Sequence, residues 1–198
     1  VTFPLSYIGS DNREGGRIAC QAVIDAMGGS GKFYIQNVRP GVSTTDQREQ
    51  GCKDAIDATN GAVELIGVDY NEDSPAKAAE QTAAVLERVP DLGGGFGTNL
   101  FGAEGMGQSV KNAGLTGVVK VAAFDAPESA ILELQDGLFD LVIAQLPYEM
   151  GQVCVEYAVA ANAGNLDVIE KRYGTGYQVI TRENVDTPES QNAIYSAE

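Results

Sequence analysis

Four polar side chains in this sequence have the types and positions to bind a ligand made of neighbouring hydroxyl groups. Asn99, Asp125 and Gln145 each follow an apolar run that is typical of a buried strand, and Arg48 lies in the first turn of a predicted helix. A carboxylate, a guanidinium and two amides together offer both acceptors and donors, as hydroxyl groups require. A metal ion or a phosphate would need more charge of one sign. The pattern predicts a polyol site with no metal and no cofactor.

Each of these residues also has a simpler structural explanation. Asp and Asn side chains often accept a backbone N–H at the start of a helix, and Asp11, Asn99 and Asp125 all precede predicted helices. A single such residue would be explained as a helix cap. Several that converge on one edge of a sheet favour a binding site.

The chain lacks the residues of the common catalytic centres. It contains no histidine, which excludes Ser-His-Asp triads and histidine metal sites. The glycine-rich segment 28–32 follows a predicted helix and leads into a strand, and no hydroxyl residue follows Lys32, so it does not match a phosphate-binding loop. Segment 93–97 does not match a dinucleotide fingerprint. An enzyme, such as a small nucleotide-dependent transferase, is therefore not favoured.

The cysteines are expected to be free. Cys20, Cys52 and Cys154 all lie within apolar helical patterns, and none belongs to a CxxC pair. Their odd number argues against a disulfide framework. We predict three buried thiols.

Short β-like runs alternate with amphipathic helical stretches along the chain. Strands are predicted at 5–9, 32–37, 62–69, 93–98, 118–124, 140–144 and 177–181, and helices at 14–27, 44–59, 74–88, 101–113, 127–135 and 147–163. This alternation predicts an α/β fold with a doubly wound parallel sheet in three αβα layers. Ligands bind such a sheet beyond the carboxyl ends of its strands, which is where the polar residues lie.

Composition narrows the partners. Hydrophobic residues make up 43% of the 198 residues, which predicts a packed core. The formal net charge of −15 disfavours binding to nucleic acid or to an anionic membrane. The sequence contains no apolar run long enough for a transmembrane helix.

Five segments in order resemble the carboxy-terminal lobe of the ribose-type (type I) periplasmic sugar-binding proteins of ABC importers. They are SYIGSDN at 6–12, REQG at 48–51, FGTN at 96–99, VAAFD at 121–125 and IAQLP at 143–147. Each segment alone is a weak signal, but their order and spacing agree across residues 6–181. The resemblance implies two doubly wound lobes that close on a sugar.

The resemblance also assigns the site. It implies that Arg48, Asn99, Asp125 and Gln145 contact a monosaccharide or a similar polyol, and it places a stacking aromatic near Tyr70. An apparent insertion follows Tyr70 in this chain. The implied partners are a sugar and an ABC permease, and the implied location is the periplasm, or the cell exterior by a lipid anchor.

The resemblance implies a division of the chain as well. Residues 1–146 would form the carboxy-terminal-type sugar-binding lobe, 147–164 a helix of the other lobe, 165–182 a return segment with a late strand, and 183–198 a loose polar tail. Family members carry another lobe before the segment at 6–12, and we expect this chain to lack it.

An apolar stripe on the predicted helix at 147–163 would then lose its usual cover. Exposure of large apolar side chains costs about 1.5–3 kcal/mol each. We expect the helix to fold back onto its own lobe or to pack against a second copy of the chain in a homodimer.

One alternative function shares the fold. The chain could be the effector-binding core of a sugar-responsive transcription regulator. The net charge and the QLP form at 145–147 favour the transport receptor.

Overall fold

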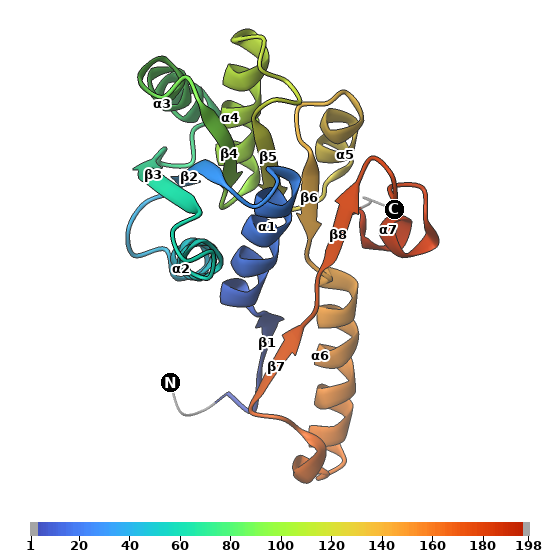
Figure 1. The fold of residues 1–198 in the computed structure, drawn as a ribbon. Helices are drawn as coiled ribbons and strands as arrows, with labels where there is room; N and C mark the ends of the chain where they lie inside the picture. Colours follow the sequence, from blue (N-terminus) through green and yellow to red (C-terminus); the bar gives the residue numbers. More distant parts are fainter. Residues whose placement is uncertain (1–3, 196–198) are drawn as a thin grey trace.

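The computed structural model describes residues 4–195 and contains every strand and helix that the hydrophobic pattern predicts (Figure 1). In chain order the elements are β1 (Tyr7–Ser10), α1 (Asn12–Ala26), β2 (Gly31–Asn37), α2 (Ser43–Asp57), β3 (Val63–Tyr70), α3 (Pro75–Arg88), β4 (Leu92–Gly97), α4 (Leu100–Asn112), β5 (Lys120–Phe124), α5 (Glu128–Gln135), β6 (Leu141–Ala144), α6 (Pro147–Asn162), the 3-10 turn η1 (Leu166–Val168), β7 (Arg172–Thr175), β8 (Gln178–Thr181) and α7 (Pro188–Ala193). The prediction did not include η1, β7 and α7.

The main sheet confirms the predicted α/β class and differs from it at one edge. Its six strands are ordered β3-β2-β4-β5-β6-β8, and the first five run parallel. The last strand, β8, pairs antiparallel with β6. The chain enters β8 from the end of the sheet at which β6 finishes, so it must run in the opposite direction.

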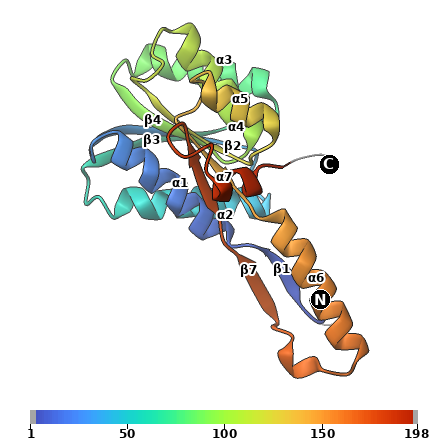
Figure 2. The ribbon, with the colours of Figure 1, turned by 90° about the vertical axis from the view of Figure 1, so that its right-hand side faces the viewer.

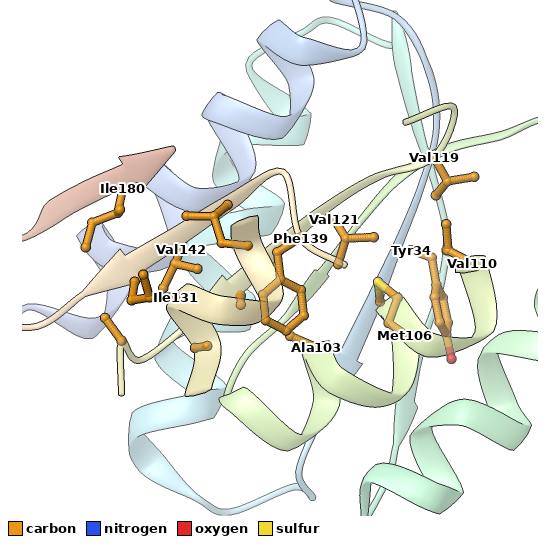
Figure 3. Close-up of a cluster of buried hydrophobic side chains, with 14 of the residues drawn as sticks. Tyr34, Ala103, Met106, Val110, Val119, Val121, Ile131, Phe139, Val142 and Ile180 are labelled. Carbon is orange, nitrogen blue, oxygen red and sulfur yellow. The ribbon is translucent and has the colours of Figure 1, made fainter. Parts of the chain in front are cut away.

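Helices cover both faces of the sheet. Figure 2 shows α1 and α2 below the sheet and α3, α4 and α5 above it. One core cluster joins α1 and α2 to the sheet through side chains such as Phe33, Ile35 and Phe96. The other includes Tyr34, Met106 and Phe139 (Figure 3). Successive side chains of a strand point to opposite faces, so Phe33 and Tyr34 serve different layers.

The structure corrects the prediction for the cysteines. Cys20 of α1 and Cys52 of α2 are fully buried and form a disulfide, with Cα atoms 5.1 Å apart. Cys154 of α6 is free but exposed. The odd number of cysteines does not exclude a disulfide here, because Cys154 stays free and the other two pair with each other.

Two glycines let α1 and α2 cross closely enough for that disulfide. A Cβ on Gly16 would lie 1.9 Å from the carbonyl oxygen of Arg48, and one on Gly51 would lie 1.8 Å from that of Arg13. No real Cβ atom approaches an oxygen so closely. The crossing therefore depends on glycine at both positions, and it places the backbone of Arg48 against α1.

Helix α6 does not fold back onto the main sheet, contrary to the first expectation. With the parallel pair β1–β7 it forms an arm that projects from the main domain (Figures 1 and 2). Within α6 only Val153 is buried, whereas Val155 and Val159 are exposed at 65% and 64% of their surface. Packing against a second copy stays a prediction, which sedimentation equilibrium can check through the mass of the particle. Among residues 4–195, α6 and the other helices are too short or too polar to cross a membrane.

Residues 183–195 pack against the main domain, contrary to the loose tail expected there. Val185 and Ala193 are buried in the core cluster that also contains α5. Thr187 caps α7 by accepting the N–H of Ser190. Residues 1–3 and 196–198 of the predicted segments lie outside the described residues.

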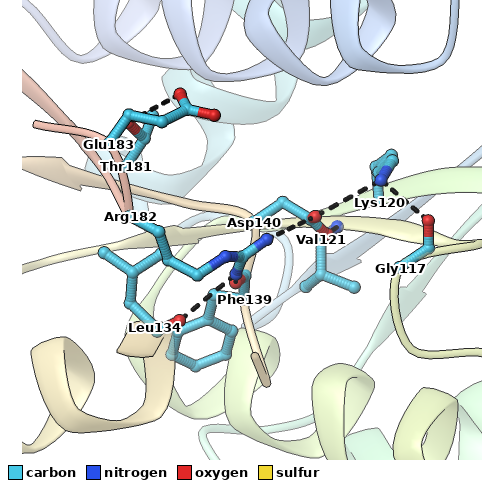
Figure 4. Close-up of polar contacts among 9 residues, drawn as sticks. All are labelled: Gly117, Lys120, Val121, Leu134, Phe139, Asp140, Thr181, Arg182 and Glu183. Atoms are coloured by element: carbon cyan, nitrogen blue, oxygen red, sulfur yellow. Dashed lines mark hydrogen bonds and ion pairs between the residues drawn. The ribbon is translucent and has the colours of Figure 1, made fainter. Parts of the chain in front are cut away.

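A polar cluster joins β8 to the amino ends of β5 and β6 (Figure 4). The Arg182 guanidinium donates to the carbonyl oxygens of Leu134 and Phe139 and pairs with Asp140 at 3.2 Å. Asp140 also accepts the N–H of Val121 at 3.0 Å. This cluster lies at the end of the sheet opposite to the carboxyl ends of the parallel strands.

Candidate functional site at the carboxyl ends of the strands

The parallel strands bring the predicted residues to one edge of the sheet. Asn99 is the second residue after β4, Asp125 directly follows β5 and Gln145 directly follows β6, and these strands are consecutive neighbours in the sheet. Their carboxyl ends therefore meet at one rim. Arg48 reaches the same rim from the second turn of α2.

Arg48 is the most buried of these residues, with 6% of its surface exposed. Its Nε donates to Asn12 Oδ1 at 3.0 Å and its NH1 to the Thr98 carbonyl at 2.9 Å. The guanidinium carbon lies 3.7 Å from the centre of the Phe124 ring. Burial lowers the pKa of Arg48, and the negative charge of Asp125 opposes that shift. The contacts hold the guanidinium flat between the ends of β4 and β5.

Asp125 and Gln145 form one hydrogen-bonded unit. Gln145 Nε2 donates to Asp125 Oδ1, and Gln145 Oε1 accepts from the Ser10 hydroxyl at 2.7 Å. Asp125 does not cap the following helix, because Pro127 holds the N-cap position of α5 without a side-chain hydrogen bond. Its carboxylate therefore serves the rim. The bond from Ser10, the last residue of β1, connects the rim to the arm.

Asn99 serves as a helix cap and lines a hollow beside Arg48. Its Oδ1 accepts the N–H of Gly102 at 3.1 Å, and its Nδ2 donates to Asp73 Oδ1 at 2.6 Å. The hollow has a volume of about 470 Å³, and its lining includes Arg39, Thr44, Thr45, Arg48, Glu72, Asp73 and Asn99. The structure thus places Arg48 and Asn99 in one hollow, with Asp125 and Gln145 on the adjoining part of the rim.

Tyr70 does not line this hollow. It ends β3 beside Asn37, and burial raises the pKa of its hydroxyl, with a further contribution from the charge of Glu49 on α2. The corresponding part of the hollow is formed by Glu72 and Asp73, which follow Tyr70. A role for Tyr70 in stacking stays a prediction that this geometry does not favour.

A strained loop presents the carboxylates of Glu72 and Asp73. Both residues have left-handed backbones, with φ of 55° and 65°. Asn71 is fully buried and holds the loop, since its Oδ1 accepts the N–H of Asp73 at 2.9 Å and its Nδ2 donates to Gln36 at 3.0 Å. Left-handed non-glycine residues persist where the surroundings impose them, and they are frequent at binding sites.

Sequence reasoning missed the residues that reach the rim from distant segments. Ser10, Asp73 and Tyr195 each bond to a predicted site residue. A signal was available for Asp73, because the apparent insertion after Tyr70 marked an unusual loop. No local signal marks Tyr195, since only the folding of the carboxy-terminal segment brings it near Asp125.

The rim does not resemble a metal centre. Within residues 4–195 there is no group of three or more His, Cys, Asp or Glu side chains that could hold a metal ion. The rim instead combines hydrogen-bond donors and acceptors, and positive, negative and neutral side chains, as Arg48, Asp125 and Asn99 illustrate. This arrangement can bind a neutral polar molecule by hydrogen bonds.

The fold and the rim together define one lobe of a type I periplasmic binding protein. The chain belongs to the periplasmic binding protein domain family, whose sequence profile matches residues 3–166. The family binds solutes and is not a family of enzymes.

Solved structures of relatives agree with this assignment. An ABC transporter solute-binding protein from Agrobacterium vitis, bound to α-D-tagatopyranose, has a TM-score of 0.90 at 45% identity, covering 98% of this chain and 64% of that one. A second A. vitis solute-binding protein, with bound D-fucose, has a TM-score of 0.85 at 31% identity, covering 96% of this chain and 64% of that one.

Curated relatives are more distant. The D-allose-binding periplasmic protein of Escherichia coli is 25% identical over 168 residues, which are 84% of this chain and 54% of the relative. The ribose import binding protein of Salmonella typhimurium is 25% identical over 179 residues, or 90% of this chain and 59% of the relative. The chain thus spans little more than half the length of these relatives.

Proposed function

We propose that this chain binds a monosaccharide as one lobe of a solute receptor for an ABC importer. The observation that carries the proposal is the rim on which Arg48, Asn99, Asp125 and Gln145 gather at the carboxyl ends of β4, β5 and β6. Relatives with bound tagatose, fucose and allose support a sugar as the ligand. The ABC permease is the proposed partner, and the periplasm the proposed location; a lipid anchor is a further prediction.

The alternative of a regulator's effector-binding core is not favoured. The curated relatives are periplasmic or import binding proteins. The net charge of −15 gives this lobe no attraction for DNA.

The site as described is one-sided, which sets the expected affinity. Ligand pockets that bind tightly bury most of the ligand surface, whereas the 470 Å³ hollow is an open depression on one face. We expect a dissociation constant in the millimolar range for D-tagatose, D-allose, D-fucose or D-ribose. Changes in the amide chemical shifts of nitrogen-labelled protein during a sugar titration measure it.

The pattern of shifts tests the assignment. Shifts that cluster at the residues around Arg48, Asn99 and Asp125 support it. The absence of any shift with all four sugars would overturn the proposed function, and micromolar binding by the monomer would contradict the one-sided site.

We also propose that Asp73 is a ligand-contacting residue. Its Oδ1 holds the Asn99 amide at 2.6 Å, and its strained backbone directs the carboxylate to the hollow. The Asp73→Ala variant should weaken sugar binding by about 3- to 10-fold, the equivalent of one hydrogen bond of about 1 kcal/mol. It should also shift the side-chain amide resonances of Asn99 in the absence of sugar.

A matched control is available in Asp91, an exposed carboxylate at the amino end of β4 that pairs with Lys32 at 2.9 Å. The Asp91→Ala variant removes the same charge from the opposite end of the sheet and should leave the affinity unchanged. Equal affinities for Asp73→Ala and wild type would exclude the contact.

A further inference from the structure

Tyr195 brings a hydroxyl group from the end of the described chain to the centre of the rim. The hydroxyl oxygen accepts the backbone N–H of Gln145 at 2.9 Å, and the hydroxyl donates to Asp125 Oδ1 at 3.4 Å. Burial raises the pKa of Tyr195 to about 12, so the proton needed for the second bond is present at neutral pH. One hydroxyl thus joins Asp125, the first residue after β5, to Gln145, the first residue after β6.

The backbone of Tyr195 supports the same residue. Asp125 has a left-handed φ of 78°, which a non-glycine residue adopts only under constraint. Its N–H donates to Ile143 at 2.9 Å, and the next carbonyl, that of Ala126, accepts the N–H of Tyr195 at 2.9 Å. The side chain and the main chain of Tyr195 therefore both act on the segment 125–126.

Tyr195 is itself held in place by the packed carboxy-terminal segment. Ala193 and Ser190 of α7 are buried, and Gln191 donates to the Val185 carbonyl at 2.7 Å. This segment lies beyond residues 3–166, which the family profile matches. The family match therefore assigns no role to it.

The hydrogen-bond directions leave one carboxylate oxygen for a ligand. Gln145 Nε2 and the Tyr195 hydroxyl both donate to Oδ1 of Asp125. Two donors on one oxygen stop the carboxylate from rotating and leave the lone pairs of Oδ2 to accept from a sugar hydroxyl.

We propose that Tyr195 is a positioning residue of the sugar site. It orients the carboxylate of Asp125 toward the ligand and fixes the start of the arm through the N–H of Gln145. The inference rests on the proposed function. It adds that the carboxy-terminal segment is part of the binding machinery rather than a cover for the core.

The Tyr195→Phe variant tests the proposal because it removes only the hydroxyl. We expect the Gln145 amide to exchange with solvent about 3- to 10-fold faster and the affinity for the best-bound sugar of the panel to fall about 3- to 10-fold. The fall should vanish for the one monodeoxy analogue of that sugar that lacks the hydroxyl read by Asp125. A general loss of structure would instead weaken all analogues equally.

The Tyr173→Phe variant is the matched control. In the wild type, the Tyr173 hydroxyl also donates to a carboxylate, that of Glu149 at 2.9 Å. This pair lies on the arm and not at the rim. The variant should leave the affinity and Gln145 exchange unchanged. If the wild type binds sugar, an unaltered affinity in Tyr195→Phe would overturn this inference but not the proposed function. An equal loss of affinity for every analogue would do the same. A wild-type protein that binds no sugar of the panel would overturn the proposed function and the inference together.

Discussion

Replacement of Arg48 by methionine is expected to abolish measurable sugar binding. Removal of one member of a buried, hydrogen-bonded charged set costs binding about 2–5 kcal/mol, which corresponds to at least ~30-fold in affinity. Arg48 is such a member, because it is buried, lies over Phe124 and donates to Asn12 and Thr98. Sugar titration followed by amide shifts measures the loss.

The same variant should also lower the free energy of unfolding. It leaves the oxygens of Asn12 and Thr98 without their donor, at a cost of about 1–3 kcal/mol for each oxygen. Arg48→Lys keeps a charge but replaces the flat fork by a single point donor, so it should restore the binding only in part.

Arg182 provides the control for stability without binding. Its guanidinium also donates to backbone carbonyls, those of Leu134 and Phe139, but at the opposite end of the sheet (Figure 4). Arg182→Met should lower stability and leave sugar affinity intact. Loss of affinity in both variants would show that Arg48 acts through the fold alone.

Loss of the Cys20–Cys52 disulfide should give the largest change in stability. The two cysteines are 32 positions apart in the sequence. A disulfide that closes a loop of that length stabilises the fold by about 3–4 kcal/mol, because it lowers the entropy of the unfolded chain. The double variant Cys20→Ala/Cys52→Ala should lower the free energy of unfolding by this amount in a urea titration.

Two comparisons make the test specific. Cys154 is exposed on α6, so Cys154→Ala should change the unfolding free energy little. Wild type unfolded with a reductant in the urea should match the double variant. Equal stability of wild type and the double variant would contradict the disulfide's contribution.

The sequence predicted most of the fold because the signals it uses are local. Continuous apolar runs marked the parallel strands, and helical spacing of apolar residues marked α1 to α6. The elements that were missed, η1, β7 and α7, are three, four and six residues long, and such short segments show no clear period. The antiparallel direction of β8 also had no local signal.

The structure brings together three predicted site residues that follow strands and Arg48, which reaches them from α2. Arg48, Asn99, Asp125 and Gln145 lie where the topology of a doubly wound sheet requires them. Tyr70 is the last residue of β3 and does not line the hollow, because the loop after it turns Glu72 and Asp73 toward the site instead.

The sequence by itself determined the α/β class, the order along the chain of every strand except β7, and the rim on which four polar residues were expected. The tertiary structure alone decided that Cys20 pairs with Cys52, that α6 forms an arm, and that Tyr195 reaches Asp125. The physical reason is range. Hydrophobic period and turn chemistry act within a few residues, whereas a disulfide between two helices or a hydroxyl from 70 residues away depends on the packing of distant segments.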